Sequence, residues 1–497
     1  MNAARPKFRD SAAVVLIRGE GASLEVFWVL RGEAVPYMPG FRAFPGGKVD
    51  AQDLELTLSG AESDFDRAAR ACAIREAFEE TGVLLGLESG GALGSDEFSH
   101  LEIDRTELLD GRVTFPELAR RRGWKFHAGA LSPAGRWTTP PFASARFDTC
   151  FFLAHLPSGQ EPNVRPGELS SGEWVRPLDG LDRFRHGEEV FAAPILWTLI
   201  ALAEGDERLS EKLVAAPERS RQPVRRIELS WGIVLHAMPT RPLPPATHTN
   251  AYLIGEKEVA LLDPGSGDPA ALEELCALID HLASEGRKLK LIVLSHHHPD
   301  HVGGVDAVRA RYRVPVAAHP ECGKHVRLDV ALADGEKIPL APGLRSWDLR
   351  VVHTPGHTRD HVCLFHEPSG SLFCGDHVAG SGTVVIDPPD GDMRAYLDSL
   401  DELVALSPKI LYPAHGSPQG GAERRLRALM SHRMEREKKV VAALSDSPQT
   451  LADLLPAVYA DTPRDLWKFA ERSMLAHLLK LEADGRARRE GERWRSA

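Results

Sequence analysis

One short run of polar residues, directly after an apolar segment, constrains this chain more than any other feature. Residues 291–294 are Leu-Ile-Val-Leu, and four metal-competent side chains follow within six positions: His296, His298, Asp300 and His301. The apolar run predicts a buried strand, so the polar residues are expected on the loop where that strand ends. Imidazole and carboxylate groups are the donors that zinc and similar metals prefer. The run therefore predicts a metal site at the end of a strand.

Three further candidates lie downstream, each just after a predicted strand: His357, Asp376 and His415. A single loop histidine is more often a surface residue or a satisfied one than a ligand. Seven candidates in this order and spacing are not expected by chance. Because ligands that follow strands can meet at one edge of a sheet, we expect all seven side chains to converge.

The full pattern, His-x-His-x-Asp-His followed by His, Asp and His, resembles the metallo-β-lactamase superfamily over roughly residues 226–420. The resemblance implies an αββα sandwich that binds two Zn²⁺, or Mn²⁺ or Fe²⁺ instead. It assigns His296, His298 and His357 to one metal, Asp300, His301 and His415 to the other, and Asp376 to both. Two metals activate water as a nucleophile at neutral pH, and Asp300 would orient that water or move its proton.

The substrate is less constrained than the reaction, because this superfamily includes thioesterases, lactonases, nucleases and β-lactamases. Residues 375–383 and 396–400 resemble a subgroup that contains a mitochondrial endoribonuclease acting on single-stranded RNA. We therefore predict a phosphodiesterase that cleaves single-stranded RNA. The alternative is a hydrolase of small-molecule thioesters, esters or lactones.

Residues 424–497 are predicted to be mostly helical. Gly485 and Gly491 indicate a basic hairpin over residues 486–495. This resembles the small winged-helix domain that follows the hydrolase in the same subgroup. The hairpin side chains that could contact phosphates are Arg486, Arg488, Arg489, Arg493 and Arg495. A solvated basic hairpin without a partner is an equally good interpretation.

A second motif lies near the N-terminus, from Arg75 to Val83. On a helix, Glu76, Glu79 and Glu80 share one face, and Gly82 is placed to end that helix. Three crowded carboxylates repel one another unless a cation lies among them, and oxygen donors suit Mg²⁺ or Mn²⁺. The motif therefore predicts a second metal site of different chemistry.

With residues 44–50 (Phe-Pro-Gly-Gly-Lys-Val-Asp), this motif resembles the Nudix box, over roughly residues 8–204. The resemblance implies an α/β/α sandwich that hydrolyses a nucleoside diphosphate linked to another group, with a nucleotide or a coenzyme A-like diphosphate as substrate. Glu79 and Glu80 would be the main metal ligands, and Glu76, oriented by Arg75, would also bind metal and act in catalysis. The loop before Arg75 is longer than usual, and Asp53 stands where the box has a glutamate. The alternative is a domain that only binds its ligand.

The chain has 497 residues, too many for one hydrophobic core, and we expect a multidomain α/β protein. The expected parts are a Nudix domain (8–204), a linker rich in arginine and proline (205–225), the metallo-β-lactamase-fold domain (226–420) and the winged helix (424–497).

The net charge of −11 argues against general binding to nucleic acid or anionic membranes. The six scattered cysteines and the lack of a long apolar stretch indicate a cytoplasmic protein that does not span a membrane. The oligomeric state stays open.

Overall fold

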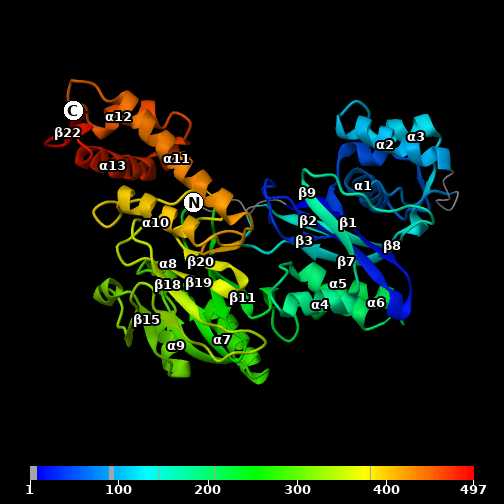
Figure 1. Ribbon diagram of the computed structural model, residues 1–497, viewed down its shortest axis with the longest axis horizontal. Helices are drawn as coiled ribbons and strands as arrows, with labels where there is room; N and C mark the ends of the chain where they lie inside the picture. Colours follow the sequence, from blue (N-terminus) through cyan, green and yellow to red (C-terminus); the bar gives the residue numbers. More distant parts are fainter. Residues whose placement is uncertain (1–7, 89–94, 144, 206, 381) are drawn as a thin grey trace. The chain divides into compact units, whose positions relative to one another are not determined.

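The computed structural model describes residues 8–88, 95–143, 145–205, 207–380 and 382–497 (Figure 1). Ser381, part of the run that resembles the ribonuclease subgroup, lies outside the described residues. The chain divides into two compact units, one ending at Val234 and the other beginning at Leu235. No described helix is both long enough and apolar enough to cross a membrane.

The first unit is built on a mixed sheet with the strand order β3-β2-β1-β8-β7. Its two longest neighbours, β1 and β8, run parallel, and β2 pairs antiparallel with β1 so that Leu16 lies opposite Phe27. This pairing makes β1 and β2 a hairpin. The strands of the path are β1 (Arg9–Arg18), β2 (Glu25–Arg31), β3 (Arg42–Ala43), β7 (Ser132–Thr138) and β8 (Phe147–His155); β4 (Gly46–Lys48) pairs with β1, and β9 (Leu169–Val175) with β2.

Helices cover both faces of this sheet, because successive side chains of a strand point to opposite sides. Val14 and Leu16 of β1 belong to the core shared with α1 (Asp64–Thr81). Val15 and Ile17 belong to the core on the other face, shared with α4 (Pro177–Arg185), α5 (Ala193–Ala203) and α6 (Leu209–Arg219). This is the α/β/α sandwich expected for the N-terminal domain.

The stretch expected to be a linker, residues 205–225, contains α6 instead of an extended connection. Leu213 and Ala216 of this helix are fully buried in the core of the first unit. Charged residues and prolines suggested a linker, but the apolar residues between them recur at helical spacing and bury one face. The other added elements of this unit are β5 (Leu58–Ser59), α2 (Ser95–Leu109), α3 (Phe115–Arg122) and β6 (Phe126–His127).

The second unit contains two sheets with helices outside them, the αββα sandwich expected for residues 226–420 (Figure 1). From β11 onwards one sheet has the order β11-β12-β13-β14-β15-β16, and the other has the order β17-β18-β19-β20-β21. The first comprises β11 (Ile233–Pro239), β12 (His248–Ile254), β13 (Glu258–Leu262), β14 (Lys288–Val293), β15 (Val316–Ala318) and β16 (Val330–Ala331). The second comprises β17 (Lys337–Ile338), β18 (Leu349–His353), β19 (Val362–His366), β20 (Ser371–Gly375) and β21 (Ile410–Pro413). The helices are α7 (Pro269–Ser284), α8 (Pro299–Val302), α9 (Val305–Tyr312) and α10 (Met393–Ala405).

The C-terminal part of this unit consists of three helices and one hairpin. They are α11 (Ala422–Ala443), α12 (Leu451–Val458), α13 (Trp467–Ala483), β22 (Ala487–Glu490) and β23 (Arg493–Ser496). Trp494 of the hairpin is buried in one core with Leu454 and Leu478. The structure confirms that this region is mostly helical and that it contains the predicted hairpin.

Candidate functional site

The ends of the strands gather the predicted metal ligands of the second unit. The strands β14, β20 and β21 end at Val293, Gly375 and Pro413, and polar candidates follow each within a few residues. Their donor atoms form two groups, each with all atoms within 4.8 Å of one another: His296, His298, His357 and Asp376, and then Asp300, His301 and His415. All seven candidates from the sequence therefore take part in these two groups.

The first group contains three imidazoles and one carboxylate, Asp376, whose Oδ2 lies 3.7 Å from His357 Nε2. His296 Nε2 lies 3.0 Å from His298 Nδ1, and His357 Nε2 lies 3.1 Å from the same atom. Burial and neighbouring histidines lower the pKa of His296 well below its usual value, and burial lowers the pKa of His298 to about 4. Burial also lowers the pKa of His357. These rings are therefore neutral at pH 7, the form that binds metals.

The second group pairs its histidines with carboxylates. His415 Nε2 lies 3.2 Å from Asp376 Oδ1 and 3.4 Å from Asp300 Oδ2, and His301 Nε2 lies 3.5 Å from Asp376 Oδ1. Burial opposes the charged form of His415, but Asp376 and Asp300 outweigh it and raise the pKa to about 10. Burial would raise the pKa of Asp300, whereas its hydrogen bond with His415 holds that pKa below the usual value. The carboxylates here stabilise positive charge.

The donor set fits divalent cations. His301 is fully buried, and its Nε2 makes no hydrogen bond to the described residues although it faces Asp376. Burial opposes charge on this ring, but Asp376 and Asp263 raise its pKa well above the usual value. A cation between the two groups would take the place of protons on His301 and His415 and would neutralise the same carboxylates.

Two buried side chains, Asp263 and Ser295, support the loop that carries His296, through hydrogen bonds. Asp263, at the end of β13, accepts the Ser295 backbone N–H at 2.8 Å and the Ser295 hydroxyl at 2.6 Å. The oxygen that accepts the Ser295 hydroxyl, Oδ2, also lies 2.9 Å from His301 Nδ1. Such contacts fix the orientation of a ligand ring.

His361 is not among the seven candidates from the sequence, but it contacts the site. Its Nε2 accepts the backbone N–H of Asp376 at 3.1 Å, and its Nδ1 lies 2.8 Å from the Thr354 hydroxyl. His361 is fully buried, and its hydrogen bond holds the backbone of the ligand candidate Asp376 in place. Its spacing of four residues from His357 was a possible signal, but an imidazole that accepts from the backbone leaves no characteristic pattern in the sequence.

Of the other histidines near the motifs, His297 points to a separate partner. Its Nδ1 lies 3.0 Å from Asp360 Oδ1, and its ring stacks on that of His325 with centroids 3.9 Å apart. His353 stacks on His319 in the same way, at 4.1 Å. These contacts explain histidines at positions that belong to neither group of donors.

The three glutamates of the N-terminal motif lie on the last turns of α1, beside strand β4, which contains Gly46 and Gly47. Glu80 Oε2 accepts the Gly46 N–H at 2.8 Å, whereas Arg75 donates to Glu76 at 2.8 Å and to Glu79 at 3.0 Å. A side chain at position 47 would overlap Glu76, because a Cβ atom there would lie 2.2 Å from its Oε1. Unlike the histidine centre, these glutamates are not among the groups of close donors found in the described part of the chain.

Arg75 is itself held by Asp53, which replaces the usual glutamate of the box. Asp53 is 2% exposed and accepts from Arg75 Nε at 2.7 Å and from Arg75 Nη2 at 3.1 Å. Burial raises the pKa of Glu80 to about 8 and that of Glu76 to about 7, the latter against the charge of Arg75. Without a cation, Glu76 and Glu80 therefore keep protons at neutral pH. Carboxylate oxygens suit Mg²⁺ or Mn²⁺, which would replace those protons.

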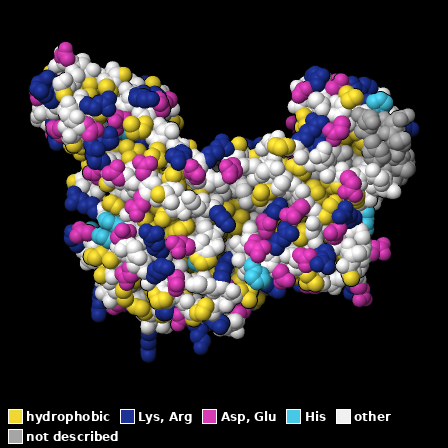
Figure 2. All heavy atoms as spheres, in the orientation of Figure 1, with side chains coloured by type: hydrophobic (Ala, Val, Ile, Leu, Met, Phe, Trp, Pro, Cys, Tyr) yellow, Lys and Arg dark blue, Asp and Glu magenta, His cyan; other side chains and the backbone are white. Residues whose placement is uncertain are grey.

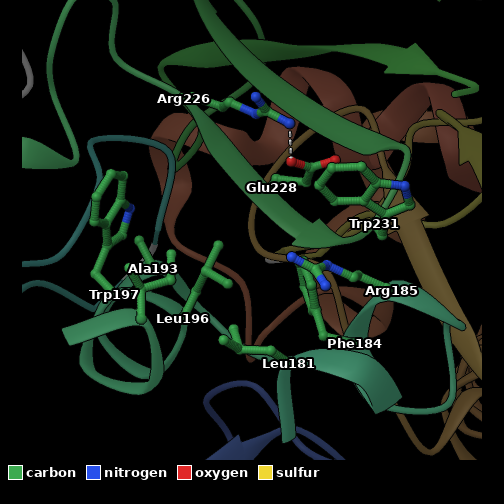
Figure 3. A pocket seen from close by; sticks show the side chains of 10 residues that line it. Leu181, Phe184, Arg185, Ala193, Leu196, Trp197, Arg226, Glu228 and Trp231 are labelled. Atoms are coloured by element: carbon green, nitrogen blue, oxygen red, sulfur yellow. Dashed lines mark hydrogen bonds and ion pairs between the residues drawn. The ribbon is translucent and has the colours of Figure 1, made fainter. Parts of the chain in front are cut away.

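A separate apolar hollow in the first unit contains none of the predicted site residues (Figure 3). It lies on the face of the sheet that α4 and α5 cover, opposite to α1, with Leu181, Phe184 and Trp197 among its walls. Arg226 and Glu228 form an ion pair at its edge. The hollow is therefore distinct from the carboxylates of α1.

Three family models match the chain. Residues 55–202 match the NUDT19 Nudix domain, residues 244–415 the metallo-beta-lactamase superfamily, and residues 450–494 the beta-lactamase associated winged helix domain. These three matches confirm the fold class and the fusion inferred from the motifs. Nudix and metallo-beta-lactamase domains are both hydrolase families, so the chain is a hydrolase.

Among curated relatives, a beta-lactamase-like protein 2 homolog of Drosophila melanogaster is 31% identical over 255 residues, 48% of this chain and 84% of the relative. An atrochrysone carboxyl ACP thioesterase of Aspergillus chevalieri is 30% identical over 48% of this chain and 76% of its own length. A solved metallo-beta-lactamase family protein from Thermus thermophilus is 27% identical, with a TM-score of 0.45 over 54% of this chain and 99% of its own. A NUDIX hydrolase from Alicyclobacillus acidocaldarius is 32% identical, with a TM-score of 0.36 over 42% of this chain and 99% of its own. The chain belongs to the metallo-beta-lactamase superfamily and carries a Nudix domain before that fold and the associated winged helix after it.

Proposed function

We propose that the second unit is a hydrolase with two divalent metals, Zn²⁺ or alternatively Mn²⁺ or Fe²⁺. The observation that carries this proposal is the presence of seven buried or half-buried donors in two adjoining groups. His296, His298 and His357 would hold one cation, Asp300, His301 and His415 the second, and Asp376 both. Two bound cations would supply a nucleophile from water at neutral pH and would neutralise charge on the bond under attack.

The residues of this chain would orient the reaction. Asp300 is the candidate for holding the attacking water and moving its proton, because its carboxylate also faces His415. Asp263 would keep His301 Nδ1 occupied, so that Nε2 stays directed at the centre. His361 would fix the Asp376 backbone in the same manner.

We propose single-stranded RNA as the substrate, with the phosphodiester as the cleaved bond. The winged-helix match and the basic hairpin support this choice. The hairpin is not wholly free for phosphate, since Arg495 pairs with Glu490 and Arg486 with Glu437. In Figure 2 the C-terminal part likewise shows basic and acidic side chains interspersed. Arg488, Arg489 and Arg493 are exposed and are the candidates for phosphate contact.

The test is a cleavage assay on a fluorescent single-stranded RNA with Zn²⁺ or Mn²⁺, beside an acyl thioester. RNA cleavage that His298→Ala abolishes and Glu79→Gln leaves intact supports the proposal. Thioester turnover without RNA cleavage, under the same conditions, refutes the RNA substrate and retains the two-metal hydrolase.

The second candidate is hydrolysis of a thioester or another small-molecule ester. One observation favours it: the relative from Aspergillus chevalieri is named as an acyl carrier protein thioesterase. The same centre would then act on a carbonyl carbon instead of phosphorus. If the Nudix domain hydrolyses a coenzyme A-like diphosphate, as expected, thioester hydrolysis by the second unit and diphosphate hydrolysis by the first would act on related molecules.

For the first unit we propose hydrolysis of a nucleotide or coenzyme A-like diphosphate with Mg²⁺ or Mn²⁺. Glu79 and Glu80 would hold the cation, and Glu76, whose pKa lies near 7, would bind it or accept a proton from water. A panel of nucleoside diphosphate derivatives, with phosphate-containing products measured, tests this proposal. Cation binding without turnover across the panel would identify a binding module instead.

We retain the expected domain limits as part of the proposal: 8–204, 226–420 and 424–497. The family matches lie inside these ranges. The region between the first two, residues 205–225, is α6 with its flanking turns.

A further inference from the structure

The metal-ligand candidate His357 is oriented by an irregular segment of the chain. Its Nδ1 donates to the Val385 carbonyl oxygen at 2.8 Å, which leaves Nε2 directed at His298. Val385 lies in the segment 382–392, whose residues form neither helix nor strand. A backbone without ladder bonds is not fixed by a neighbouring strand, so other contacts must set its position.

The C-terminal helices bond to this segment on both sides of Val385. Arg433, on α11, donates to the Val384 carbonyl at 2.5 Å. Ser473, on α13, accepts the Ile386 backbone N–H at 3.4 Å. The carbonyl that orients His357 therefore lies between two residues that the last part of the chain holds in place.

Further contacts extend this support along the segment. Arg472, next to Ser473, donates to the Asp387 carboxylate and to the Pro388 carbonyl. Val384 and Ile386 are buried in one apolar core with residues of α11 and α13, among them Leu426, Leu429 and Ala476. Polar and apolar contacts thus fix the same few residues.

Arg433 is unusual for a residue that only packs, because it is 2% exposed and charged. Its guanidinium carbon lies 5.2 Å from the centre of the Tyr396 ring, and the Tyr396 hydroxyl donates to the His377 carbonyl at 3.0 Å. Burying a guanidinium is costly unless specific contacts compensate it. An apolar side chain would fill this part of the core equally well. Only a donor such as arginine can make the hydrogen bond to the Val384 carbonyl.

We propose that α11 and α13 position His357 through the Val385 carbonyl, with Arg433, Arg472 and Ser473 as positioning residues. The winged-helix part then supports the metal centre itself, in addition to any contact with substrate. This inference goes beyond the proposed function, but it rests on the two-metal centre.

The experiment measures metal binding by the full-length protein, independently of turnover. Zn²⁺ affinity is determined by competition with a chromophoric chelator, and Co²⁺ in place of Zn²⁺ reports the ligand geometry by its visible spectrum. The variants are Arg433→Ala, Arg433→Lys and the double variant Arg472→Ala/Ser473→Ala. The matched control is Arg427→Ala, an exposed arginine of α11 that pairs with Glu423 on the same helix.

We expect one of the two Zn²⁺ equivalents to bind about tenfold more weakly in Arg433→Ala and in the double variant, the lower end of what outer contacts contribute to metal affinity. The second equivalent keeps its affinity, the Co²⁺ spectrum changes, and Arg433→Lys recovers part of the loss. The control Arg427→Ala behaves as wild type. Equal affinity and an unchanged spectrum in the folded double variant would overturn the inference.

Two other results are also decisive. If Arg433→Ala does not fold, the double variant decides alone. We expect the double variant to fold, because Arg472 is half exposed and Ser473→Ala removes one atom. If the wild-type protein binds fewer than two equivalents, the proposed two-metal function fails. Two equivalents that bind with wild-type affinity in every variant would refute only the positioning role.

Discussion

The two candidate centres of this chain are assembled in opposite ways. The histidine centre draws donors from loops that follow several strands, between His296 and His415. The glutamates of the first unit lie within two turns of one helix, α1. The first arrangement exists only when the sandwich is folded, whereas helical geometry alone places Glu76, Glu79 and Glu80 on one face.

The two centres also differ in how their charges are balanced. Burial keeps His296 and His298 neutral, and carboxylates surround the two histidines whose pKa values are raised. In the first unit, burial raises the pKa of Glu80 to about 8 with little opposite charge nearby. The histidine centre is thus nearly balanced before a metal binds, whereas a cation at the glutamates has to displace protons from Glu76 and Glu80. We expect tight binding at the former and weaker, exchangeable binding at the latter.

The largest expected effect follows from removing one ligand of the histidine centre. In His298→Ala we expect hydrolysis by the second unit to fall at least about 10³-fold, because metal polarisation contributes several kcal/mol. The measurement is initial rates on bis(p-nitrophenyl) phosphate and on an acyl thioester. Turnover of a nucleoside diphosphate substrate should be unchanged in the same variant. Loss of both activities would show that the two centres are not independent.

The reciprocal change tests the other side of the comparison. Glu79→Gln removes one charge from the glutamate set, and we expect diphosphate hydrolysis to fall roughly 10²-fold. Mn²⁺ binding, followed by electron paramagnetic resonance, should weaken in parallel. The matched control is Glu117→Gln, which alters a helix cap in α3 and no residue of the motif. An active Glu79→Gln enzyme would exclude Glu79 as a metal ligand.

A smaller effect is expected behind the histidine centre. Asp263→Asn keeps the volume but replaces the carboxylate that faces His301, so metal affinity should drop about 10- to 100-fold. Isothermal titration of the metal-free protein with Zn²⁺ measures the change. A variant with wild-type affinity would mean that Ser295 and the backbone suffice to orient His301.

Much of both centres could be predicted from the sequence, because the relevant signals are local. The Leu-Ile-Val-Leu run before His296 predicts a strand end, and the three glutamates at helical spacing predict a shared face. The support of His361 for Asp376 and of Arg433 for the segment near Val385 was not predictable in this way. These contacts join residues through backbone atoms, and a backbone carbonyl or N–H has the same identity at every position. The helix α6 was missed for a different reason: charge and proline obscured the spacing of Leu213 and Ala216.

The smallest effect we predict concerns how the glutamate motif ends. Gly82 terminates α1 at φ 75°, and a Cβ atom there would lie 3.3 Å from Arg105 Nη1. Gly82→Ala should therefore lower the free energy of unfolding by about 1–2 kcal/mol, the cost of a left-handed conformation for an ordinary residue. Gly123→Ala is the control, since Gly123 ends α3 at φ 68° with no atom near its Cβ position. Both should lower the midpoint of thermal unfolding, but only Gly82→Ala should also reduce diphosphate hydrolysis, because Arg105 binds the Glu79 carbonyl. Equal loss of activity in both variants would mean that stability, and not the local geometry of α1, limits the first centre.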